Sequence, residues 1–323
     1  MVSILPNSQP MPNVCILTDS TVQFTRSNFP GHERVYIIPS SLQNVIRPEG
    51  EFLSSCISAQ KQLIPPSPQK FIQWYARLSH VYDSILVLTL SAQLNPTMLN
   101  ALGAADQYNR LPGNYRDEEV NLRRWAGEVR PTPHTSPHIQ AIPNEPYNNS
   151  APVEVIDSQT TSSGLGMLVQ IAASAASEGA TLKEIDQRLR ANIPRIYMLL
   201  CIPELTYLAN SGQMNFAQAL VGEMTGMLPI FTFEEGRLVP MEKARTPRHL
   251  FEVFQEFMSE FEAPSQVALI RSLGRSSMQN NPIRQFVNDT FPEAFFSEHT
   301  IQPHLAALFG PHSVGLVVLD STD

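Results

Sequence analysis

The stretch Val14-Cys15-Ile16-Leu17-Thr18-Asp19-Ser20-Thr21 decides the fold of this chain. It is a short apolar run that ends in hydroxyl and acid residues. Residues 85–91 (ILVLTLS) and 153–158 (VEVIDS) show the same pattern. Short apolar, β-branched runs followed by helical patterns are typical of parallel strands in a doubly wound sheet. The sequence therefore predicts an α/β fold whose N-terminal part is built on a mostly parallel sheet.

The polar residues at these three strand ends point to one shared site. In doubly wound sheets, ligands bind just beyond the carboxyl ends of the strands. Ser, Thr and Asp are also ordinary helix N-caps after a strand, and for any single run a cap is the simpler interpretation. Three such ends together favour a binding site over three unrelated turns.

Composition limits the class of protein. A chain of 323 residues is long for one core and comfortable for two domains. The formal net charge of -8 argues against a nucleic-acid partner, which requires a basic face. No run reaches the roughly 18 apolar residues of a membrane helix, so stable membrane insertion is not expected. Residues 1–12 lack a basic start and an apolar core, so we expect a flexible tail there and not a signal peptide.

Cysteines and histidines predict neither disulfides nor a metal site. Cys15, Cys56 and Cys201 are few and widely separated, so a reducing cytoplasm is the expected location. The closest histidine pair, His134 and His138, falls among prolines that prevent a helix from presenting both rings on one face.

The N-terminal domain is predicted to cover residues 13–195. Within it, residues 109–151 form a Pro-rich insertion that lacks periodicity, with a short helix near 117–125. Three helices are expected. One opens at Ser67-Pro68, one is capped by Thr97 with Leu99, Leu102 and Ala105 on one face, and a small-residue helix covers 164–178. A capping box at Thr181-Leu182-Lys183-Glu184 opens a fourth, amphipathic helix.

The C-terminal domain is predicted to cover residues 196–323. Segments 227–233 and 237–242 flank Glu234-Glu235-Gly236 and predict a hairpin. Thr246-Pro247 opens an apolar helix, and strands are expected at 197–202, 266–270 and 314–319. This order predicts a second, layered α/β domain that contains a hairpin.

Several motifs, in order along nearly the whole chain, resemble those of the DegV family. They are Thr18-Asp19-Ser20-Thr21, Pro66-Ser67-Pro68, Ile156-Asp157-Ser158, Ser163-Gly164-Leu165-Gly166, Leu205-Thr206-Tyr207-Leu208, Ser211-Gly212-Gln213 and Glu242-Lys243-Ala244-Arg245. No single motif is diagnostic, but their order and spacing make a specific match.

The resemblance implies a lipid-binding protein that holds a long-chain fatty acid in a tunnel between its two domains. It implies further that the acyl carboxyl group is presented to a separate fatty-acid kinase, so that the chain is a carrier and not an enzyme. No cofactor is implied other than the bound fatty acid. Burying an acyl chain is worth roughly 0.8 kcal/mol per methylene, so the tail alone can supply most of the affinity.

The sequence departs from the family at the head-group end. Leu63 stands where the family has a threonine, Leu308 where it has a late histidine, and Gln213 where it has an arginine. A buried carboxylate needs hydrogen-bond donors, and these leucines offer none. The expected head-group residues are, in order, Thr18, Ser20, Leu63, Ile64, Ser91, Asn95, Thr97, Ser163, Gly164 and Leu308.

The tail of the fatty acid is expected to contact Leu220, Met224 and Met227, because methionine adapts to the shape of a ligand. The same residues could equally fill a core. A degenerate interaction protein with a filled or repurposed pocket is therefore one alternative function.

A hydrolase is the other alternative. Ser20, Ser91 or Ser158 would act as nucleophile with a histidine such as His304 or His312 as its base. The chain has no Gly-x-Ser-x-Gly elbow, and serines of this kind are more often caps and turn formers.

Overall fold

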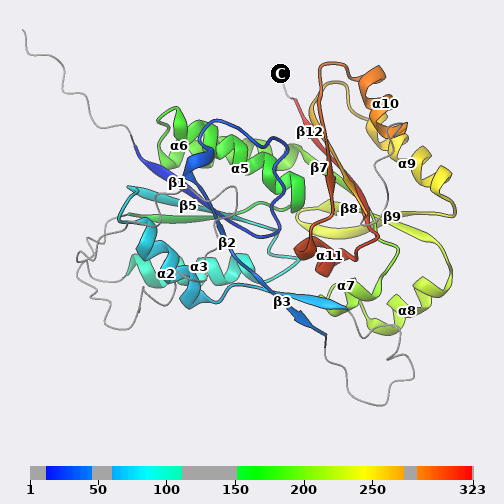
Figure 1. Cartoon of the computed structure of the whole chain (residues 1–323), viewed down its shortest axis with the longest axis horizontal. Coiled ribbons are helices and arrows are strands. Elements are labelled where there is room, and N and C mark those ends of the chain that lie inside the picture. The colour runs from blue at the N-terminus through cyan, green and yellow to red at the C-terminus, as the bar shows by residue number, and fades with distance from the viewer. Residues whose placement is uncertain (1–11, 46–59, 111–150, 273–281, 322–323) are drawn as a thin grey trace, which may run out of the picture.

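A computed structural model of the chain describes residues 12–45, 60–110, 151–272 and 282–321 (Figure 1). The predicted tail at 1–12, apart from residue 12, lies outside these ranges. So do most of the predicted insertion at 109–151 and the short helix near 117–125.

Four parallel strands form the first sheet, in the order β2-β1-β5-β6. The central strands are buried on both faces, which explains why they read as continuous apolar runs and not as alternating patterns. The prediction of a parallel N-terminal sheet is confirmed. The strands are β1 (Val14–Asp19), β2 (Val35–Ile38), β5 (Ser84–Thr89) and β6 (Val153–Asp157).

Helices cover both faces of this sheet, as a doubly wound fold requires. On one face, α2 and α3 pack on the odd-numbered side chains of β1; on the other, α5 and α6 pack on its even-numbered ones. The predicted caps at Ser67 and Thr181 both form, the second as a capping box. The helices are α2 (Pro68–Leu78), α3 (Thr97–Asn109), α5 (Ser162–Ser177) and α6 (Leu182–Asn192), with short 3-10 turns η1 (His32–Arg34) and η3 (Ile193–Arg195).

The predictions for α3 were wrong in two respects. Thr97 is the first helical residue and not the cap; the Asn95 side chain, two residues earlier, accepts the Thr97 N–H. Leu99 and Leu102 are 57% and 46% exposed, because the helix buries alanines against the sheet instead. Ala101 and Ala104 allow the helix to pack close to the sheet, which larger residues on that face would prevent.

A six-stranded mixed sheet organises the second half, in the order β11-β10-β12-β7-β8-β9. Strands β10 and β11 run parallel and all other neighbours are antiparallel; β8 and β9 form the predicted hairpin. The strands are β7 (Ile196–Cys201), β8 (Leu228–Glu234), β9 (Arg237–Ala244), β10 (Pro264–Arg271), β11 (Phe295–Thr300) and β12 (Val314–Asp320).

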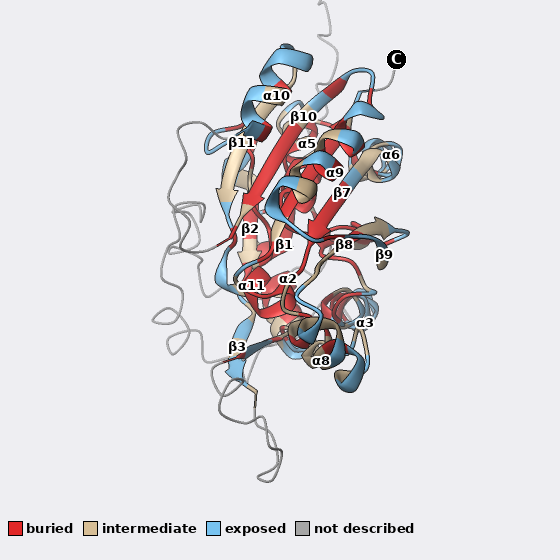
Figure 2. Ribbon diagram, turned by 90° about the vertical axis from the view of Figure 1, so that its right-hand side faces the viewer, coloured by how far each residue is buried: buried red, intermediate tan, exposed pale blue. Residues whose placement is uncertain are grey.

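The two faces of this sheet have different partners. Helices α9 (Pro247–Ser259) and α10 (Pro282–Thr290) cover one face. In Figure 2, α9 lies in front of the mostly buried strands β7 and β10 of this sheet. The other face meets α7 (Thr206–Asn210), α8 (Phe216–Met224) and α11 (Pro303–Phe309). We call the parts built on the two sheets the N-terminal and C-terminal lobes. Strand β7 begins at Ile196, and the domain boundary after residue 195 stays a prediction.

A small antiparallel sheet, not predicted from the sequence, extends from the N-terminal lobe toward α7 and α8 (Figure 1). It pairs β3 (Ser41–Asn44) with β4 (Lys61–Ile64). The Gln62 side chain donates to the carbonyl of Asn210 at the end of α7, over 3.2 Å. This sheet therefore links the two lobes.

One apolar cluster, which we call the interlobe cluster, is built from both lobes. The N-terminal lobe contributes Leu63, Leu90, Leu94 and Met167. The C-terminal lobe contributes Met198, Leu200, Ile202, Leu205, Leu208, Ala219, Phe231, Ala268, Ile270, Ile301, Leu305, Ala306, Ala307, Leu308, Phe309, Val317 and Leu319. Most of its residues come from the inner face of the C-terminal sheet and from α7, α8 and α11, and the others come from β4, the loop after β5, and α5.

Candidate functional site

The loop after β5 carries two of the predicted head-group residues, Ser91 and Asn95, and a third, Thr97, begins α3. Ser91 is fully buried and donates its hydroxyl to the Gly236 carbonyl over 2.7 Å. Gly236 has a φ of 80°, and a Cβ there would fall on the Ser91 hydroxyl, so this contact needs glycine. Asn95 accepts from the N–H and the hydroxyl of Thr97, which fixes the start of α3. The hydroxyl of Ser91 thus ties the N-terminal lobe to the tip of the β8–β9 hairpin.

The leucines at the altered head-group positions lie in the interlobe cluster. Leu63 and Leu308 are 3% and 2% exposed. The carbonyl of Leu63 accepts a long hydrogen bond of 3.4 Å from the Asn95 amide, so Asn95 contacts the same wall of the cluster. Ile64, the next residue, is half-buried. The structure therefore brings Leu63, Asn95 and Leu308 to one region.

Gln213, which replaces the family arginine, reaches across the lobes. Its side-chain amide donates to the carbonyl of Gln93 over 2.9 Å and lies 3.4 Å from that of Leu94. Both carbonyls belong to the loop that holds Ser91 and Asn95. Gln213 of the C-terminal lobe therefore holds the loop after β5 in place, a role that the sequence did not indicate.

Hydroxyl groups with unused hydrogen-bonding capacity lie at the end of β1 and at the start of α5. Thr18 and Ser163 are fully buried, and their hydroxyl oxygens have no hydrogen-bond partner within the described ranges. Ser20 is already engaged, since it donates to the Ile38 carbonyl and accepts the Ser40 N–H. Gly164 packs so closely that a Cβ would meet the hydroxyl of Thr160.

The predicted tail residues lie on and just after α8. Leu220 and Met227 are half-buried, whereas Met224 is 80% exposed and lies on the outer face of the helix. Ala219, the neighbour of Leu220, is fully buried in the interlobe cluster. Whether any of the three predicted residues contacts a ligand stays a prediction.

The serines considered as nucleophiles all donate to backbone carbonyls. Ser20 donates to Ile38, Ser91 to Gly236 and Ser158 to Thr160. Each of these hydroxyls thus donates its proton to a backbone carbonyl, and a serine nucleophile needs a basic partner instead. The geometry disfavours the hydrolase alternative.

Asp19 forms a fully buried polar junction in the N-terminal lobe. Its fully buried carboxylate accepts the Leu90 N–H over 2.7 Å and the N–H and hydroxyl of Thr21 over 2.8 and 2.7 Å. Burial raises the pKa of Asp19 despite these donors, which favour the charged form. The carboxylate links the end of β1 to the end of β5 and so positions the loop that follows β5.

Asp19→Asn is expected to lower the free energy of unfolding by about 1–3 kcal/mol, because an amide presents an N–H group toward groups that themselves donate. Urea unfolding measures the difference. Asp106→Asn is the matched control, since Asp106 forms an exposed ion pair with Arg110 and its loss should cost less than about 0.5 kcal/mol. Equal effects of the two substitutions would contradict the role assigned to Asp19.

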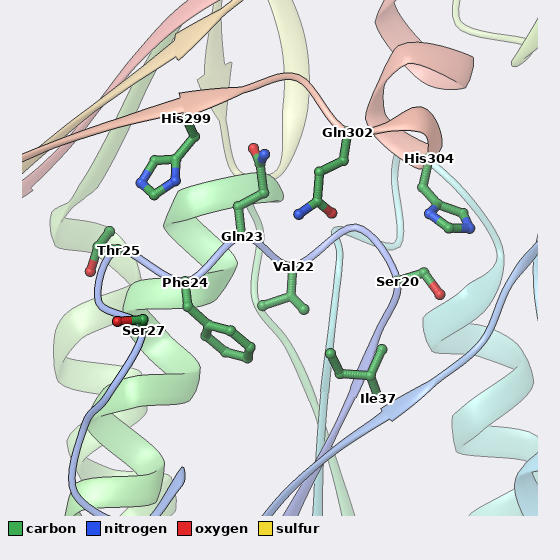
Figure 3. A pocket seen from close by; sticks show the side chains of 10 residues that line it. All are labelled: Ser20, Val22, Gln23, Phe24, Thr25, Ser27, Ile37, His299, Gln302 and His304. Carbon is green, nitrogen blue, oxygen red and sulfur yellow. The ribbon is translucent and has the colours of Figure 1, made fainter. Parts of the chain in front are cut away.

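A polar pocket of about 700 Å³ opens between the loop after β1 and the segment that joins β11 to α11 (Figure 3). Its lining residues are Ser20, Val22, Gln23, Phe24, Thr25, Ser27, Ile37, His299, Gln302 and His304. The pocket lies at a junction of the lobes, because the Gln23 amide donates to the Thr300 carbonyl over 2.8 Å. Of this set, only Ser20 and His304 were candidates from the sequence, since no local pattern pairs residues 20–27 with residues 299–304.

Burial lowers the pKa of both pocket histidines, His299 and His304. Two carboxylates oppose the shift: Glu298 beside His299, and Asp19 beside His304; the Ser40 backbone also supports protonation of His304. A histidine whose folded-state pKa is depressed stays neutral in the folded protein at a pH where the unfolded chain already binds a proton. It therefore stabilises the folded state above its unfolded pKa of 6.5, and that contribution is lost as the pH falls.

We accordingly expect the free energy of unfolding to fall between about pH 7.5 and about pH 5, in part because of these two rings. Urea unfolding of the wild type and of a His299→Gln/His304→Gln double variant at both pH values isolates their share. The double variant should lose less stability on acidification. An identical loss in both proteins would rule out this cause.

The model of the family described as "Uncharacterised protein, DegV family" matches residues 13–321. The chain belongs to the DegV family. A DegV domain-containing protein of Staphylococcus aureus (strain COL) is 26% identical over 191 residues, which are 58% of this chain and 68% of that protein. The resemblance read from the motifs is thus confirmed.

Solved structures of DegV proteins share the two-domain fold. A fatty acid binding DegV family protein from Streptococcus agalactiae matches with a TM-score of 0.70 and 16% identity, covering 96% of this chain and 100% of that one. The fatty acid kinase (Fak) B3 protein of Streptococcus pneumoniae, solved with linoleic acid, matches with a TM-score of 0.67 and 13% identity over the same shares. These likenesses establish the fold.

The DegV motifs occupy defined places in this fold. The opening motif supplies Thr18, Asp19 and Thr21 at the end of β1, and the leucine-threonine-tyrosine-leucine motif begins just before α7 and runs through its first turn. Within the described ranges, no helix has the length and apolar character needed to cross a membrane, and no group of three or more His, Cys, Asp or Glu residues could hold a metal ion.

Proposed function

We propose that this DegV protein binds a long-chain fatty acid whose tail lies in the interlobe cluster. One observation carries the proposal: residues of both lobes build a single apolar cluster, and the altered head-group positions Leu63 and Leu308 lie within it. The described fold supports it, since solved DegV proteins of the same fold are described as fatty acid binding.

Affinity can come almost entirely from the tail. Roughly fourteen methylenes at about 0.8 kcal/mol each give on the order of 11 kcal/mol of gross free energy, before the entropy lost on binding is subtracted. The head group then needs only enough donors to replace lost hydration. Thr18 and Ser163 have unused hydroxyls, and Asn95 lies against the wall formed by Leu63.

We propose further that the chain is a carrier without turnover of its own, which presents the acyl carboxyl group to a separate kinase in the cytoplasm. The match to the fatty acid kinase (Fak) B3 protein supports this role. Leucines at two head-group positions and Gln213 at a third make the contacts of the carboxyl group in this chain different from those implied by the family motifs.

Extraction of the purified protein with chloroform and methanol, followed by mass spectrometry, tests the binding proposal. We expect close to one fatty acid per chain. If none is retained, the protein should instead take up added linoleic or palmitic acid, measured by calorimetry. A folded protein that neither retains nor takes up fatty acid would refute the proposal and favour an interaction protein with a filled pocket.

A further inference from the structure

The polar pocket beside the loop after β1 has the character of a second ligand site. Several of its polar side chains have no hydrogen-bond partner among the described residues. They are the amide of Gln302, the hydroxyl of Ser27 and the Nδ1 atom of His299, whose Nε2 lies 3.0 Å from the Ser297 hydroxyl. Figure 3 shows the Gln302 and His299 side chains directed toward the loop that carries Ser27. All three residues line the same cavity, and polar groups without a protein partner there are available to a ligand.

Three apolar side chains form one side of the pocket, and the loop that carries two of them is held in place. Val22, Phe24 and Ile37 lie together on the side of the pocket opposite Gln302 (Figure 3). Phe24 is fixed by its contact with Phe29, with ring centroids 5.2 Å apart. The loop itself is anchored by Gln23, which donates to Thr300 and accepts from the Ser162 hydroxyl over 2.7 Å. A flat apolar body can therefore rest on a preformed surface while its edge meets the polar groups.

The charges around the pocket select against ionic ligands. No Lys, Arg, Asp or Glu is among the lining residues that the structure describes. Arg26, on the same loop, is stacked over the Phe295 ring at 4.2 Å, and Glu298 is paired with Arg271 and Arg284. Burial lowers the pKa of both histidines and so favours their neutral forms, in which each ring offers one donor and one acceptor.

We propose that this pocket binds a small uncharged heteroaromatic ligand of nucleoside size, through Ser27, His299 and Gln302. A cavity of about 700 Å³ falls in the range of small-molecule sites. Amide and imidazole groups match the mixed donors and acceptors at the edge of a nucleobase, and the apolar side of the pocket matches its face. The site is separate from the interlobe cluster, because no lining residue belongs to that cluster.

The probes are the four ribonucleosides, with adenosine monophosphate as the charged comparison. Binding to the full chain is measured by saturation-transfer NMR and calorimetry. We expect at least one nucleoside to bind, and its monophosphate to bind no more tightly. Ser27→Trp should abolish binding by filling the pocket, whereas Asn28→Trp, at the exposed neighbouring position outside the lining, should leave it unchanged. Gln302→Ala, at an exposed position, should weaken binding about fivefold to tenfold.

Several results would overturn the proposal: no nucleoside binds, binding survives in Ser27→Trp, or the monophosphate binds more tightly than its nucleoside. Thermal unfolding checks that each variant is folded. If Ser27→Trp does not fold, Gln302→Ala still tests the proposal. The fatty acid content of Ser27→Trp should equal that of the wild type. This readout separates failure at this pocket from failure of fatty acid binding.

Discussion

Gly166→Ala is expected to lower the free energy of unfolding by about 3 kcal/mol or more, although alanine is the better helix former. Gly166 lies in α5, and a Cβ there would fall on the carbonyl oxygen of Gln23, far inside van der Waals contact. The obstacle is backbone, which cannot rotate away as a side chain can. The Gln23 N–H also donates to the Ser162 carbonyl over 3.1 Å, so the loop is held from both sides.

Gly103→Ala provides the matched control. Gly103 is also helical, in α3, but nothing lies within 4 Å of a Cβ built on it. The same substitution should there stabilise the protein by about 0.5–1 kcal/mol through helix propensity alone. Chemical denaturation of both variants gives the two differences. If Gly166→Ala were neutral or stabilising, the close approach of α5 to the loop after β1 would be wrong.

The backbone plan of the N-terminal lobe could be predicted from sequence because its signals are local. Runs such as residues 14–17 are apolar and β-branched, and Ser67 and Thr181 cap helices through contacts within four residues. The hairpin around Gly236 is local as well. In each case, the residues that determine the structure are neighbours in the chain.

The predictions that were wrong concern features determined by contacts between residues that are distant in the sequence. Leu99 and Leu102 suggest an apolar face, yet α3 is packed through alanines because it approaches the sheet closely. Pro303, at the first position of α11, was a signal that could have located that helix.

The polar pocket could not be predicted, because it joins residues 20–27 to residues 299–304 through a fold that brings the lobes together. For the same reason, no local pattern showed that Gln213 holds the loop after β5. Sequence motifs thus identified the family, whereas the hydrogen bonds between distant segments became visible only in the structure.

The second large effect is expected at Ala219, where Ala219→Trp should reduce retained fatty acid to less than about a tenth of the wild-type amount. Ala219 is fully buried in the interlobe cluster, on the inner face of α8. A tryptophan there occupies volume that, under the proposed function, holds the acyl chain. Losing even a few buried methylenes costs about 0.8 kcal/mol each, and a tenfold loss of affinity needs only about 1.4 kcal/mol.

Met224→Trp is the control on the same helix. Met224 is 80% exposed, so an added ring there meets solvent, and fatty acid retention should not change. Extraction and mass spectrometry of both variants measure retention, with thermal unfolding to verify folding. If tryptophan prevents folding, Ala219→Leu adds a smaller side chain at the same position. This variant should lose part of the retained fatty acid. Full retention of fatty acid by folded Ala219→Trp would show that the interlobe cluster is not the acyl site. Loss of fatty acid in Met224→Trp alone would place the tail against the outer face of α8.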